Sequence, residues 1–169
     1  MEEFEGISIR GRMAYMLCMF ENVLLYYRVE KKEWRWILER LWQFTTVQFV
    51  DDWLYEIAEF MPDSVLNDTV QGLEFLTEDE FYSLRSIYTN TYEDVLYMIR
   101  IIFELGTLEM YSTIRDFSPN TLEKLGEGIE IMQRLGLELI SIEPFKKYRF
   151  IEGHGWGKPF NGKEFSQFV

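Results

Sequence analysis

The stretch IRGRMAYMLCMFENVLLYY, residues 9–27, decides the fold. Its large apolar side chains recur every three or four residues, which is the spacing of one helix face. These side chains are Ile9, Met13, Met16, Leu17, Phe20, Val23, Leu24 and Tyr27. The spacing predicts a first helix over residues 8–28. Glu21 and Asn22 interrupt the apolar run, which is therefore too short and too polar for a membrane span of about 20 residues.

The same spacing predicts further helices along the chain. They cover residues 31–45, 47–61, 78–89 and 91–105, with a loop and a short helical turn over 62–76 and a shorter helical segment over 107–116. Thr77 followed by Glu80 is a capping box at the start of the helix over 78–89. The pair Ser118-Pro119 starts the last helix, which ends at Gly136.

Within this last helix, Gly126 and Gly128 lower stability unless a neighbouring element packs closely against them. After residue 136 the apolar residues alternate around Pro144, which predicts two short strands paired as a hairpin. The predicted fold class is mainly α, a helical bundle or array of about six helices with a short C-terminal β-hairpin-like appendage. We expect one domain over residues 1–169: a helical body over 1–136, then short strands and a glycine- and aromatic-rich tail over 137–169.

The composition is that of a folded chain, because 47% of the residues are apolar and 17% are aromatic. The single cysteine, Cys18, excludes an intrachain disulfide, and its apolar neighbours favour a small buried side chain over a reactive thiol. The N-terminal MEEFEG is acidic, whereas a secretory signal begins with basic residues. We therefore expect a protein of the reducing cytoplasm.

The negative charge is concentrated in the middle of the chain. The net charge is −12, and residues 41–115 hold fourteen acidic but only three basic side chains. Such a surface repels nucleic-acid phosphates and anionic lipid, so we expect no nucleic-acid and no membrane partner. It attracts a basic protein partner and speeds the encounter. The alternative is that the acidity serves only solubility.

Six carboxylates are the candidate partner-binding residues. They are Asp52, Glu56, Glu59, Asp63, Glu78 and Asp79. At 100° per residue the first three share the polar face of the helix over 47–61, and Asp63 continues their line past the proline. The last two lie in the first turn of the helix over 78–89, where the helix dipole also favours anions. A solvated helix face remains the alternative explanation for all six.

No catalytic centre is recognisable in the sequence. The one histidine, His154, lies in GHGWGKP (residues 153–159), but a Walker loop would need glycine at Glu152 and Ser or Thr at Pro159. The segment instead predicts a glycine-rich turn that packs Trp156 and Phe160 onto the helices. Neighbouring carboxylates on one helix diverge by 100°, so they form no metal or acid–base site by themselves. We expect no enzyme activity, no metal and no cofactor.

Some aromatic side chains lie off the apolar helix faces. Trp36 and Tyr55 fall outside the stripes of their predicted helices, and Trp and Tyr are enriched in the residues that dominate binding energy at interfaces. The alternative is that a second layer of helices covers these rings.

In size, acidity, aromatic content and lack of catalytic motifs, the chain resembles the immunity proteins of bacterial polymorphic toxin systems, including those of contact-dependent inhibition. The tail GHGWG, residues 153–157, resembles a family signature motif. The resemblance implies a cytoplasmic antidote that binds a basic toxin domain, with a nuclease as the main candidate, and it carries no binding residues across. The alternatives are an adaptor or regulatory module that binds other proteins, and an enzyme with an unrecognised carboxylate site.

Overall fold

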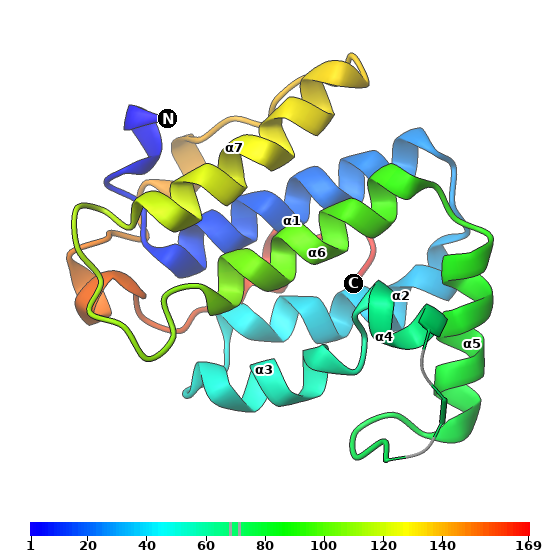
Figure 1. Ribbon diagram of the computed structural model, residues 1–169. Helices are drawn as coiled ribbons and strands as arrows, with labels where there is room; N and C mark the ends of the chain where they lie inside the picture. The colour runs from blue at the N-terminus through cyan, green and yellow to red at the C-terminus, as the bar shows by residue number, and fades with distance from the viewer. Residues whose placement is uncertain (68, 71) are drawn as a thin grey trace.

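The computed structural model describes residues 1–67, 69–70 and 72–169, and the first predicted helix lies at its centre (Figure 1). This helix, α1 (Ile9–Tyr26), has 15 of its 18 residues buried. The helices α2 (Lys31–Trp42), α6 (Glu93–Thr107) and α7 (Pro119–Arg134) pack against it, as does the 3-10 turn Gly162–Phe165 near the C-terminus. Because neighbours surround α1, apolar residues occupy its whole circumference.

The prediction of a mainly helical fold is confirmed. The helices α3 (Val50–Ala58), α4 (Pro62–Asn67) and α5 (Glu78–Thr89) complete the helical body. At the start of α5 both bonds of the predicted capping box form, from the Glu80 amide to Thr77 Oγ1 and from the Thr77 amide to Glu80 Oε2. The predicted loop over 62–76 contains α4 as its helical turn, and residues 68 and 71 of that range lie outside the described residues.

The short helix predicted over residues 107–116 is wrong. After Thr107 the chain forms turns, and Tyr111, Asp116 and Phe117 adopt positive φ. Left-handed backbone at residues other than glycine does not continue a right-handed helix. The turns bring Ser118 to the buried guanidinium of Arg12, which donates from Nη1 to the Ser118 carbonyl. The carboxylate of Glu109 also accepts hydrogen bonds from the hydroxyls of Ser112 and Ser118, so contacts other than helical spacing stabilise these turns.

The predicted C-terminal hairpin is also wrong. In residues 137–169, all of which are described, the only β pairing is an isolated bridge between Arg149 and Ile7. Short 3-10 turns at Glu143–Phe145, Glu152–Gly155 and Gly162–Phe165 take the place of strands.

The apolar alternation has another cause, because this segment wraps around the helical body and its rings stack on one another. The ring centroids of Tyr148 and Phe160 lie 3.6 Å apart, and those of Phe145 and Phe165 lie 4.8 Å apart. The predicted packing of the glycine-rich turn is present, since Trp156 and Phe160 pack against the core.

Close packing against glycine occurs at two helix crossings. A Cβ on Gly128 would lie 2.7 Å from Met16 Sδ of α1, so this glycine has the close neighbour that the sequence analysis named as the exception, whereas Gly126 has none within 4 Å. A Cβ on Gly106 of α6 would lie 2.7 Å from the buried ring of Trp53 in α3. Among the described residues no helix combines the length and the hydropathy that a membrane crossing requires.

Candidate functional site

Two of the predicted partner-binding carboxylates form ion pairs within the chain. Glu56 of α3 pairs with Arg40 of α2, and its side chain is 16% exposed. Asp63 of α4 pairs with Arg100 of α6 through both oxygens, at 2.9 and 3.1 Å. Both pairs join neighbouring helices of the body. In the isolated protein, Arg40 and Arg100 therefore partly neutralise the charges of Glu56 and Asp63.

Glu59 has a structural role at the end of α3. Its carboxylate accepts hydrogen bonds from the backbone amides of Glu74, Phe75 and Leu76, at 2.7, 3.0 and 2.8 Å. These three bonds hold the segment before α5 against the end of α3. Glu59 thereby orders part of the acidic region, and its own oxygens are occupied.

The other three predicted carboxylates are exposed. Asp52 lies in the first turn of α3, and Glu78 and Asp79 lie in the first turn of α5. Asp79 also lines a cavity between α2 and α5, together with Arg40 and Lys163. Arg40 and Lys163 partly balance the charge of Asp79, whereas no described Arg or Lys pairs with Asp52 or Glu78.

Around the start of α3 the structure gathers acidic and aromatic side chains that we call the acidic–aromatic surface. It consists of Phe49, Asp51, Asp52, Tyr55 and Tyr111. The three rings are 66%, 58% and 81% exposed, which is unusually high for side chains of this size. In the described part of the chain neither Asp51 nor Asp52 has an Arg or Lys partner.

Tyr111 and the start of α3 belong to different segments that lie near each other. The neighbouring Tyr55 side chain, with the nearby carboxylate of Asp51, raises the pKa of Tyr111 above its ordinary value. Sequence spacing identified Tyr55 as lying off the apolar face, and the structure confirms its exposure. Trp36, the other such ring, is half-buried with its centroid 5.5 Å from that of Phe60. Tyr111 was missed because the spacing predicted a helix over this segment, whereas the chain forms turns after Thr107.

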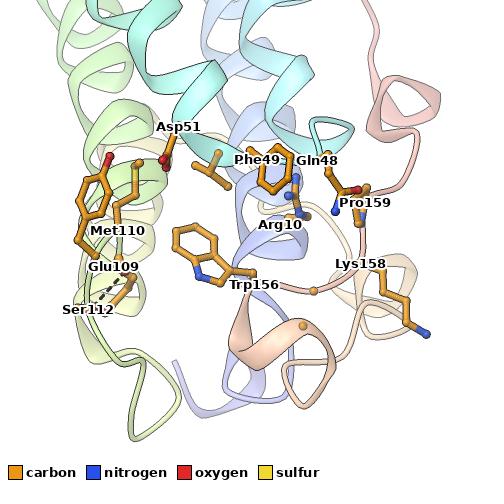
Figure 2. Close-up of a pocket in the computed structure, with 14 residues that line it drawn as sticks. Arg10, Gln48, Phe49, Asp51, Glu109, Met110, Ser112, Trp156, Lys158 and Pro159 are labelled. Carbon is orange, nitrogen blue, oxygen red and sulfur yellow. Dashed lines mark hydrogen bonds between the residues drawn. The ribbon is translucent and has the colours of Figure 1, made fainter.

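A pocket of about 450 Å³ lies beside the acidic–aromatic surface. Its lining includes Phe49, Asp51 and Tyr111, together with the buried Arg10 from α1 and Trp156 from the C-terminal segment. Figure 2 shows these walls, with Asp51 on one side, Arg10 and Phe49 on the other, and the indole of Trp156 near the middle.

Comparisons with protein families, curated proteins and solved structures give no match. The site is therefore interpreted from its own residues. His154 is exposed in the turn over 152–155. The described residues contain no group of three His, Cys, Asp or Glu side chains placed to hold a metal ion. The arrangement around α3 thus offers exposed rings, unpaired carboxylates and an adjacent pocket, which are features of a binding surface.

Proposed function

We propose that this protein is an immunity protein, which binds a basic toxin domain of a bacterial polymorphic toxin system and blocks it. The observation that carries the proposal is the acidic–aromatic surface, with unpaired carboxylates next to three exposed rings. Large rings supply contact area at little cost in side-chain entropy and are enriched among the residues that dominate binding energy. The carboxylates attract a basic partner and orient it during the encounter.

The chemistry of the surface favours a nuclease as the toxin. A nuclease holds its substrate with Lys and Arg side chains that neutralise phosphates. Asp51 and Asp52 can occupy the place of two phosphates, because no described cation pairs with them. The helix dipole also stabilises both carboxylates in the first turn of α3. That local effect does not account for the exposure of Phe49, Tyr55 and Tyr111 beside them.

Charge reversal on this surface tests the proposal. Where a large secreted protein with a variable C-terminal domain is encoded directly upstream, that domain is the partner to test. The measurement is its association rate at several salt concentrations. We expect Asp51→Lys combined with Asp52→Lys to slow association at least about tenfold at low salt and to weaken its salt dependence. Tyr55→Ala combined with Tyr111→Ala should mainly raise the dissociation rate, because buried rings hold the complex after it forms.

The matched control reverses two exposed carboxylates on the α7 side of the molecule, Glu130→Lys with Glu138→Lys, which changes the net charge by the same amount. Figure 1 shows α7 on the opposite side of α1 and α6 from α3. We expect this control to leave the dissociation rate unchanged and to slow association much less. Equal effects of the two charge reversals would show that net charge alone governs binding. No binding of the upstream domain by the unaltered protein would exclude the antidote function.

A further inference from the structure

Arg10 is a buried cation whose hydrogen-bonding capacity is only partly used. It is the second residue of α1 and is 3% exposed. Its Nη1 donates to the Phe44 carbonyl, whereas its Nε is buried without a hydrogen-bond partner. Burial lowers the pKa of Arg10 to about 10, which leaves the side chain charged at neutral pH.

The neighbouring Arg12 differs from Arg10 because its guanidinium has several hydrogen-bond acceptors and carboxylates nearby. Arg12 donates to the Phe4 carbonyl and to Thr121 Oγ1, and the carboxylates of Glu5 and Glu109 favour its charged form. Within the described residues no carboxylate pairs with Arg10. A buried charge without a counter-ion is energetically costly. The described residues supply no counter-ion for Arg10, so an anion bound from solution would stabilise it.

Arg10 lines the pocket of about 450 Å³ described above. This volume lies within the range of about 300–1,000 Å³ that is typical of small-molecule sites. The other walls include the apolar side chains of Phe49, Val50, Met110 and Trp156. The pocket therefore combines one poorly satisfied buried cation with flat and flexible apolar surfaces from three separate segments.

The other charged groups at the pocket do not compete with Arg10 for an anionic ligand. Glu109 accepts hydrogen bonds from the hydroxyls of Ser118 and Ser112, at 2.7 and 2.9 Å. Asp51 has the same sign of charge as an anionic ligand and does not attract one. Lys158 lies 3.8 Å from the carboxylate of Glu152, and its side chain points away from the pocket in Figure 2. Arg10 is thus the charged group of this lining that is left to select a ligand.

We propose that this pocket binds a small organic anion with a flat apolar body, whose anionic group pairs with the Arg10 guanidinium and whose body lies against Trp156 and Met110. A guanidinium presents its donors in a planar fork that matches a carboxylate. An aromatic body gains contact area against the indole and the thioether. The ligand binds to the protein without its macromolecular partner, so this site stands or falls separately from the proposed inhibitor function.

The test is a titration of the ¹⁵N-labelled protein with 2-naphthoate, followed through the indole N–H resonance of Trp156. Trp156→Phe assigns that resonance. We expect a saturable shift, and at least about tenfold weaker binding of the neutral analogue 2-naphthamide and of inorganic sulfate, which lacks the flat body. Arg10→Gln should weaken binding of 2-naphthoate by a similar factor. Lys32→Gln is the matched control, because Lys32 is an exposed cation of α2 outside the pocket lining, and it should leave the affinity unchanged.

Equal binding of the acid and the amide, or no saturable shift with the acid, would overturn the proposal. Equal binding of sulfate would show that the flat apolar body adds no affinity, which contradicts that part of the proposal. Should Arg10→Gln fail to fold, the comparison of acid with amide on the unaltered protein still decides the role of charge. Phe49→Ala then tests the pocket wall, because Phe49 is exposed and its removal leaves the core intact. We expect it to weaken 2-naphthoate binding, and unchanged affinity would place the ligand elsewhere.

Discussion

Glu21 is a buried carboxylate that fastens the C-terminal segment to α1. It accepts hydrogen bonds from Trp42 Nε1 at 2.8 Å, from the Gln167 amide at 2.6 Å and from the Ser166 hydroxyl. Glu21→Ala leaves these donors buried without an acceptor, so we expect the free energy of unfolding to fall by about 2–4 kcal/mol in urea denaturation. Glu21→Gln keeps one acceptor oxygen and should lose less. Equal losses for the two variants would contradict this role.

Helical spacing predicts where Glu21 lies along the chain but not what it binds. In the sequence it only interrupts the apolar run of the first helix. Its partners Trp42, Ser166 and Gln167 lie on two other segments, and no local pattern indicates which donors will meet a buried acceptor. The same holds for Arg10, whose burial and incomplete pairing appear only when the distant segments are placed around α1.

Cys18 behaves as the sequence predicts, as a small buried side chain that is 6% exposed. Burial, with the nearby charge of Glu21, raises the pKa of its thiol to about 12. Because the thiolate is the reactive form, we expect very slow reaction with a disulfide reagent such as DTNB at pH 8 and full reaction in concentrated urea. Fast reaction of the folded protein would show that Cys18 is accessible.

At the scale of elements, two helix glycines have opposite surroundings. A Cβ on Gly126 of α7 meets no atom within 4 Å, whereas one on Gly106 of α6 meets the Trp53 ring at 2.7 Å. We expect Gly126→Ala to raise the free energy of unfolding by about 0.5–1 kcal/mol, because alanine restricts the unfolded chain. Gly106→Ala should lower it by about 1–3 kcal/mol through overpacking. Thermal and urea denaturation measure both, and effects of the same sign would contradict the packing.

Asp94 connects α1, α6 and α7. Its carboxylate accepts hydrogen bonds from the Tyr27 hydroxyl and from Arg134 Nη2, each at 2.7 Å. Burial by itself would raise the pKa of Asp94, but these two bonds outweigh it and hold the pKa below its ordinary value. A lowered folded-state pKa adds stability that is present above the unfolded-state pKa of about 3.9 and is lost as the pH falls through the folded value.

The substitution Asp94→Asn tests this contribution to acid stability. We expect it to lower the free energy of unfolding by about 1 kcal/mol at pH 7. The difference from the unaltered protein should shrink as the pH falls below about 4, because the native carboxylate then becomes protonated. Urea denaturation from pH 7 to pH 2.5 measures it. A difference that stays constant over this range would show that the charge of Asp94 plays no part.

The elements that sequence predicts best are those with local determinants. The bounds predicted for α5 agree with the structure because the capping box of Thr77 and Glu80 fixes its start through contacts within one turn. The prediction for 107–116 fails because side-chain contacts around Ser118, from Glu109 and from the distant Arg12, are not visible in the local spacing. The hairpin prediction after residue 136 fails because the aromatic residues there stack on one another and pack on the helical body. Their spacing in the sequence resembles the alternation of a strand.

At the scale of the whole molecule, the concentration of acidic residues in the middle of the chain is only partly a surface property. Helix periodicity predicted correctly that Asp52 is exposed, but it could not predict that Arg40 and Arg100 would cross from other helices to Glu56 and Asp63. The candidate binding surface therefore differs from the predicted one: it lies at the start of α3 and contains Asp51 as well as Asp52. The rings that complete it come from two segments, Phe49 and Tyr55 at α3 and Tyr111 after α6, so only the fold brings them together.

Because α1 contacts helices from both halves of the chain and the C-terminal segment, we expect the molecule to unfold as one cooperative unit. Deletion of residues 166–169 removes two donors to Glu21 and the buried ring of Phe168. Stability should therefore fall by about 3 kcal/mol or more, since a buried ring and buried hydrogen bonds are lost together.

The transitions of this truncated chain, followed by far-ultraviolet circular dichroism and by tryptophan fluorescence, should still coincide. Gln167→Ala is the control, because it keeps the backbone amide that Glu21 accepts and removes only an exposed bond to Asn22. It should change stability by less than about 0.5 kcal/mol. If fluorescence changed before circular dichroism in the truncated chain, the C-terminal segment would be a separate unit, and α1 would not be the common core of the molecule.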